Sequence, residues 1–187
     1  MDIRTSRLIL RPMPADFLRA SSEGGTPARL SALIGLNVPA DWPPEAELAA
    51  LRLSDLQLDP EGLPWSVRAV ALRHSGEMIG HAGFHSRPAP GHLAAWAPEA
   101  VEVGYVIYPP HRRQGYAHEA LVALIHWAHV EAGVPRFVAS VCPENPASCA
   151  LLARVGFRCI ASFTDVLDGL QYVMLLDRPR LVDLSGR

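Results

Sequence analysis

The chain has 187 residues, 49% of them hydrophobic and 19% charged, which is long enough for one well-packed domain and excludes a disordered protein. Its formal net charge of −2 excludes the basic excess that is typical of nucleic-acid-binding proteins. The longest apolar runs, such as Ala120–Ile125, fall well short of the roughly 18 residues that a membrane span needs, and residues 1–11 lack the core of a signal peptide. We therefore expect one cytoplasmic domain over residues 1–187, with neither nucleic acid nor membrane as a partner.

In the first half of the chain, the hydrophobic spacing predicts one strand, two helices and then three strands. Leu8 and Leu10 alternate with arginines, as in a half-buried strand. The turn residues His74-Ser75-Gly76-Glu77 join two later strands into a hairpin. The predicted elements are Thr5–Met13, Pro14–Ser22, Pro44–Leu58, Trp65–Arg73, Met78–Ser86 and Ala100–Tyr108.

The second half alternates helices and strands. Helical spacing ends at Gly133 and Pro135 in one case and at Gly156 in the other, and Asp168-Gly169 predicts a hairpin turn. The predicted elements are Ala117–Ala132, Arg136–Val141, Pro146–Val155, Cys159–Leu167 and Gln171–Leu176. Together the two halves predict an α+β fold with a mixed sheet of about seven strands and about four helices, parallel where the later helices cross over.

The segment His111–Ala117 has the composition of a phosphate-binding turn. It opens the longest predicted helix, whose first backbone N–H groups have no partner within the helix and carry the positive end of its dipole. Gly115 allows phosphates to approach these groups closely, and two arginines precede it. The segment matches neither the nucleotide P-loop nor the dinucleotide turn, so we expect a pyrophosphate site of another kind.

The pattern Arg112-x-x-Gly115-x-Ala117 resembles the acetyl-CoA motif of the GNAT N-acetyltransferase superfamily. Its surroundings, Glu102-Val103-Gly104-Tyr105 before it and Asn145-x-x-Ser148 after it, are similar to the Rim-type (RimJ/RimL-like) branch, whose named members acetylate the N-termini of ribosomal proteins. The match runs from Thr5 to Leu176 and is thinnest over Ser22–Pro64. The resemblance implies a GNAT fold, in which the fourth and fifth strands, here Ala100–Tyr108 and Arg136–Val141, splay apart.

The resemblance also implies that acetyl-CoA is the co-substrate and assigns the residues that bind it. The pantetheine arm would lie in the splay, the pyrophosphate would bind the amides that open the helix, and Asn145 would hold the pantetheine from the far side. Asn145 is also a natural N-cap before Pro146, alone or together with that role. The implied coenzyme-binding residues are Val106, Ile107, Tyr108, Arg112, Arg113, Gln114, Gly115, Tyr116, Ala117, His118 and Asn145.

Catalysis needs a proton donor for the leaving thiolate and an acceptor for the amine proton. Many members of the superfamily carry a donor tyrosine seven residues after the asparagine, where this chain has Leu152; the Rim-type branch is similar to this chain in having a serine at Ser148, proposed as the donor. Glu102 is the candidate base, acting directly or through water, and His81 and His85, on one sheet face, are alternates. Each residue also has a structural interpretation. Ser148 could be a solvated helix residue, Glu102 a carboxylate paired with a neighbouring arginine, and His81 and His85 core or rim histidines.

We therefore expect an enzyme that transfers an acetyl group to a primary amine, working as a monomer or homodimer. The amine is a protein N-terminus or a small molecule, and we expect its pocket to come from Ser22–Pro64 and the Phe163–Tyr172 hairpin. An α-amine, with a reference pKa of about 8, loses its proton more readily than a lysine side chain, at about 10.4. The alternatives are another acyl-CoA donor and a CoA-binding sensor without chemistry. Three unpaired cysteines give no metal pattern, and we expect no metal.

Overall fold

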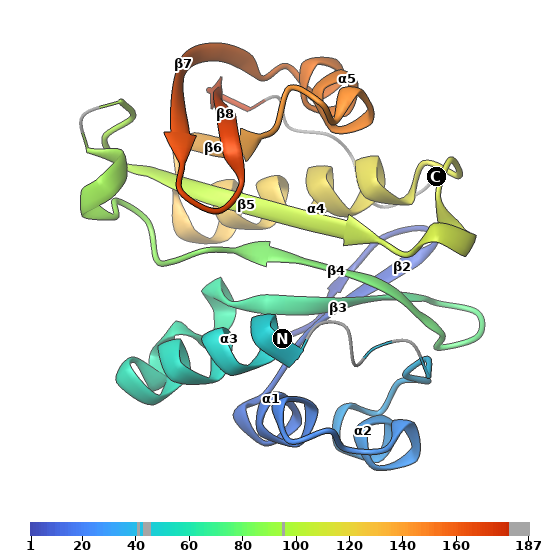
Figure 1. The fold of residues 1–187 in the computed structure, drawn as a ribbon. Coiled ribbons are helices and arrows are strands. Elements are labelled where there is room, and N and C mark those ends of the chain that lie inside the picture. Colours follow the sequence, from blue (N-terminus) through green and yellow to red (C-terminus); the bar gives the residue numbers. More distant parts are fainter. Residues whose placement is uncertain (41, 43–45, 95, 180–187) are drawn as a thin grey trace.

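The computed structural model describes residues 1–40, 42, 46–94 and 96–179, and its centre is one mixed β-sheet (Figure 1). Within this described part, eight strands follow the spatial order β1-β2-β3-β4-β5-β6-β8-β7, and of these only β5 and β6 are parallel neighbours. The strands are β1 (Ile3–Arg4), β2 (Leu8–Pro12), β3 (Val67–Leu72), β4 (Met78–Phe84), β5 (Ala100–Ile107), β6 (Arg136–Val141), β7 (Arg158–Asp165) and β8 (Gly169–Asp177).

The α-helices of the described residues begin and end at residues suited to those places. Thr26 caps α2 and Asn145 caps α5, each followed by proline at the first helical position. Gly133 ends α4 in the left-handed conformation, which glycine adopts at little cost. The helices are α1 (Ala15–Ser22), α2 (Pro27–Ile34), α3 (Ala46–Leu58), α4 (Tyr116–Ala132) and α5 (Pro146–Val155), with 3-10 turns η2 (Pro60–Trp65), η3 (Gly91–Leu93) and η4 (Pro109–His111).

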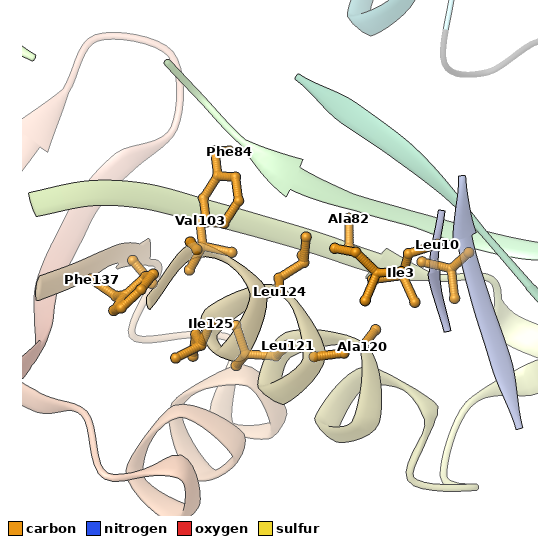
Figure 2. Close-up of a cluster of buried hydrophobic side chains, with 14 of the residues drawn as sticks. Ile3, Leu10, Ala82, Phe84, Val103, Ala120, Leu121, Leu124, Ile125 and Phe137 are labelled. Carbon is orange, nitrogen blue, oxygen red and sulfur yellow. The ribbon is translucent and has the colours of Figure 1, made fainter. Parts of the chain in front are cut away.

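Helices cover both faces of the sheet, and each face has its own hydrophobic cluster. Figure 2 shows Leu121, Leu124 and Ile125 of α4 against Val103 and Phe137 of the sheet. On this face α4 and α5 lie together, whereas α1, α2 and α3 pack on the other face (Figure 1). Side chains of a strand alternate between the two faces of the sheet. The odd-numbered residues of β5 therefore lie on the α4 face, and the even-numbered residues lie on the other face.

The pairing of β5 with β6 ends early, and the two strands splay apart. The two strands are in register only at Ala100, Val101 and Glu102, although β5 continues to Ile107. Beyond Glu102 the residues Gly104–Val106 are only half-buried. The divergence of these parallel strands confirms the splayed pair expected from the sequence.

The predicted α+β class and the mixed sheet are confirmed, with two additions. Strand β1 and helix α2 were not predicted, so the sheet has eight strands rather than about seven and the described residues form five α-helices rather than about four. The predicted helix Pro44–Leu58 is found from Ala46, and its first two residues lie outside the described part. None of the described helices is both long and apolar enough to cross a membrane.

Candidate active site

The turn before α4 presents backbone N–H groups beside the end of β5. Gly115, with φ +82°, is the N-cap, and no side chain caps the helix. Arg113 also has a positive φ of +65°, so the chain turns sharply where the sequence predicts phosphate binding. The Nε of Arg112 donates to the carbonyl of Ile107 at 2.8 Å, which ties the turn to the end of β5. An uncapped helix N-terminus beside two arginines is a suitable site for a pyrophosphate.

Arg7, just before β2, holds this turn through contacts of its guanidinium group. Its guanidinium donates to the carbonyl of Gln114 at 3.0 Å, lies 4.6 Å from the ring centre of Tyr116 and pairs with Glu119 at 2.7 Å. Glu119 also accepts hydrogen bonds from Thr5, Ser6 and the Arg7 amide. Although burial opposes the ionisation of Glu119, these contacts outweigh it and lower its pKa. The first turn of α4 is therefore held to the start of the chain.

Two hydroxyl groups meet on the α4 face of the sheet, beside the splay. The Oη of Tyr105, on β5, lies 2.8 Å from the Oγ of Ser148, in the first turn of α5. Burial raises the pKa of Tyr105, partly offset by the hydrogen bond with Ser148. Asn145 accepts from the Ser148 amide at 3.1 Å, so the expected N-cap is present and fixes the serine backbone.

The carboxylate of Glu102 lies on the opposite face of β5, where the splay begins. Its side chain is only 10% exposed. One oxygen accepts from Ser140 of β6 at 2.6 Å, and the other lies 3.4 Å from both Nδ1 of His85 and Nε2 of His92. Burial alone would raise the pKa of Glu102, but the hydrogen bonds and charge of His85, with those of Ser140 and His92, lower it to about 2.

The other predicted base candidates lie in different places. His85 borders Glu102 and is 43% exposed at its side chain. His81 is buried on the same sheet face, with its ring edge-on to Trp42. No arginine pairs with Glu102 among the described residues, so the structure disfavours the arginine-paired interpretation of this carboxylate.

A pocket of about 360 Å³ opens beside His85, between α3 with η2 and the segment after β4. Trp65 and Leu56 supply apolar lining. Its acidic residues are paired with arginines: Asp55 with Arg52 at 2.9 Å, and Asp59 with Arg87. The pocket lies partly in the predicted acceptor segment Ser22–Pro64, and it adds Trp65, Ser66, residues 85–88 and Pro90, which were not expected to line the acceptor pocket.

Sequence reasoning missed four residues that the fold brings to the site: Arg7, Tyr105, His92 and Ser140. Tyr105 lies inside the quoted motif, whereas nothing local marks His92 as a neighbour of Glu102. Within the described residues no group of three or more histidines, cysteines or carboxylates could hold a metal ion.

Comparisons with known proteins find similar sequences and similar folds. A model of the acetyltransferase (GNAT) domain matches residues 7–158. The uncharacterized N-acetyltransferase YoaA of Bacillus subtilis is 33% identical over 103 residues, which are 55% of this chain and 52% of YoaA, so the match spans about half of that relative.

Solved structures share the whole fold. An acetyltransferase from Agrobacterium tumefaciens is 25% identical, with a TM-score of 0.61 and 95% of each chain covered. RimJ of Mycobacterium smegmatis, in complex with CoA-disulfide, is 21% identical, with a TM-score of 0.61 over 91% of this chain and 81% of RimJ. At 21% identity, the similarity to RimJ is evidence for the fold alone.

Proposed function

The chain belongs to the acetyltransferase (GNAT) family, and from that membership we propose that it transfers an acetyl group from acetyl-CoA to a primary amine by direct attack in a ternary complex. The observation that carries the proposal is the pair of polar clusters on opposite faces of β5. Glu102 with His85 lies on one face, and Tyr105 with Ser148 lies on the other. A thioester held in the splay would have a proton acceptor on one side and a proton donor on the other.

The coenzyme would bind along the splay from α4 to α5. The amides and side chains of Arg112, Arg113, Gln114, Gly115, Tyr116, Ala117 and His118 would hold the pyrophosphate, and the backbone of Val106, Ile107 and Tyr108 the pantetheine. The uncapped helix and the half-buried edge of β5 support this placement. Asn145 would reach the pantetheine from the far side while capping α5. The CoA complex of RimJ, a structural neighbour, is consistent with it.

Ser148 would donate a proton to the departing sulfur. A hydroxyl has one proton, so Ser148 can donate to sulfur only when it accepts from Tyr105. Burial raises the pKa of Tyr105, so its phenol stays protonated and has a proton to donate to Ser148. Leu152 stands where many family members have a tyrosine, and this pair of hydroxyls would take over the role of that tyrosine.

The amine would lose its proton on the Glu102 face, directly to Glu102 or through an intermediary. The pocket beside His85 gives the acceptor a route to this face. We propose a protein N-terminal α-amine as the acceptor, in keeping with a Rim-type enzyme. Both acidic residues of the pocket are compensated by arginines, which argues against a polyamine.

Transfer to a panel of amines tests the proposal. The protein is incubated with acetyl-CoA and, separately, with tetrapeptide amides beginning with alanine or serine, Nα-acetyl-lysine amide, tyramine and spermidine. Released thiol and the mass of the product are measured, with Gly115→Glu as the control. We expect thiol release and peptides carrying one acetyl group. Acetylation of spermidine or tyramine alone would overturn the acceptor, and binding of CoA without transfer to any amine would favour a sensor.

A further inference from the structure

The carboxylate of Glu102 is well placed but is a poor proton acceptor by itself. Although burial opposes it, the contacts with His85, Ser140 and His92 lower the pKa of Glu102 to about 2, well below the reference pKa of an α-amine, about 8. A general base works best when its pKa lies near the pH at which the enzyme works. Imidazole is the side chain whose reference pKa is closest to neutral pH. Two imidazoles border the carboxylate, so the better acceptor lies beside it.

The geometry separates the two histidines. Nδ1 of His85 faces Oε2 of Glu102 at 3.4 Å. The opposite nitrogen, Nε2, lies over Gly104, where a Cβ atom would be only 2.7 Å from it. Gly104 is the second residue beyond the last β5–β6 register pair, so Nε2 lies at the start of the splay. His92 instead turns its Nε2 toward the same carboxylate oxygen, at 3.4 Å.

We propose that Nε2 of His85 is the atom that takes the proton from the incoming amine, and that Glu102 is a positioning residue that holds the ring through Nδ1. A carboxylate beside Nδ1 fixes the tautomer with a proton on that nitrogen and leaves the lone pair on Nε2. It also stabilises the positive ring once the proton has arrived. Ser140, bonded to the other oxygen at 2.6 Å, keeps the carboxylate in place.

The protons balance as follows. An alkylammonium gives up two protons in becoming an amide. The first N–H bond breaks as the proton binds Nε2 of His85, and the free amine then forms its bond to the acetyl carbon. The carbon–sulfur bond breaks with its electron pair on sulfur. Ser148 gives its proton to the sulfur. The second amine proton then passes through solvent to Ser148 and replaces the proton that was lost. The half-exposed His85 passes its proton to water, so amide, thiol and one proton leave.

Several groups border the ring. Glu102 faces it from β5, and His92 of η3 shares that carboxylate. Asp59 and Arg87, paired with each other, line the same pocket as His85. From α3, Arg52 donates to the backbone carbonyl of His85 at 2.9 Å and pairs with Asp55. These contacts involve the backbone and Nδ1 of His85, whereas Nε2 lies over Gly104. The inference rests on the proposed function, and it names the low-pKa α-amine as the acceptor class that an imidazole base suits best.

The test is a pH profile of kcat/KM for wild type, His85→Gln, His92→Gln and Glu102→Gln, with acetyl-CoA and an alanyl tetrapeptide amide as substrates. We expect His85→Gln to lose about 10²–10⁴-fold at pH 7 and to recover above the pKa of the peptide amine, where no base is needed. The affinity for acetyl-CoA should stay unchanged. Glu102→Gln should lower the rate with the same recovery, and His92→Gln should lose less than His85→Gln.

Gly104→Ala provides a second variant that keeps every titrating group. Its methyl group would displace the His85 ring, so the rate at pH 7 should fall and then recover at high pH, as in His85→Gln. Wild-type activity in His85→Gln at pH 7, or a larger loss in His92→Gln, would overturn the inference while leaving the proposed function intact. Absence of acetyl transfer by the wild type would instead overturn the proposed function.

Discussion

Tyr105 and Ser148 share one hydrogen bond, and its direction decides which hydroxyl has a proton to give. The atoms are 2.8 Å apart and lie on two elements that only the fold brings together, β5 and α5. If Tyr105 donates, Ser148 keeps its own proton for the coenzyme sulfur. The role of the serine therefore depends on a residue 43 positions earlier in the chain.

Tyr105→Phe should lower the single-turnover rate about tenfold, which corresponds to losing one orienting hydrogen bond of about 1.4 kcal/mol. The affinity for acetyl-CoA should change little, because the ring and its packing remain. Ser148→Ala should lower the rate at least as much. Combining the two substitutions should add no further loss, since both act through one proton. Fully additive losses in the double variant would refute the shared role.

Sequence reasoning found the residues that lie within or beside local motifs. Gly115, Asn145 and Ser148 follow from helix-start chemistry and from the family resemblance. His92 could not be found, because it reaches Glu102 only through the path of the segment between β4 and β5. Turn chemistry predicts that such a segment is a loop, but not where one of its side chains will lie.

At the scale of elements, the first turn of α4 depends on the start of the chain. Glu119 receives hydrogen bonds from Thr5, Ser6 and Arg7, and Arg7 in turn bonds the carbonyl of Gln114. Removing the charge of Glu119 would loosen both the segment between β1 and β2 and the turn before α4.

Glu119→Gln should reduce the free energy of unfolding by about 1–3 kcal/mol, because it weakens charge-assisted hydrogen bonds. The pKa of Glu119 is lower in the folded chain, so its contribution is present above the unfolded pKa and is lost as pH falls through the folded value. The difference between wild type and variant in urea unfolding should therefore shrink below about pH 4.3, the reference value for glutamate. Glu131→Gln, at the exposed end of α4, is the matched control and should be near neutral. Equal effects of the two substitutions would contradict this account.

The helices and strands were mostly predictable, and the exceptions have physical reasons. The bounds of α5 and β6 match the expectation, because caps and proline mark their ends. Strand β1 has two residues, too few for alternation to be visible, and it exists only through pairing with β2. Helix α2 has its capping Thr26-Pro27 but only eight residues, and it lies where the family resemblance is thinnest.

For the whole molecule, one sheet separates two kinds of chemistry. Its α4 face carries the turn before α4 and the hydroxyl pair, while its other face carries Glu102, His85 and the neighbouring pocket. Strands β5 and β6, the only parallel pair among the described strands, diverge between them. The splay was predicted only through the family resemblance, because neither periodicity nor spacing shows where two strands part, and the division of the polar groups between the two faces was not predicted.

The most direct test of the account is a calorimetric titration of acetyl-CoA into wild type, Arg112→Ala and Gly115→Glu. The account predicts binding by the wild type and weakening by about 1–3 kcal/mol in Arg112→Ala, as for a charge-assisted hydrogen bond. Gly115→Glu should abolish binding, because it forces a side chain into a left-handed position and places a negative charge against the pyrophosphate. A folded Gly115→Glu variant, checked by its circular dichroism, that binds acetyl-CoA with wild-type affinity would contradict the account.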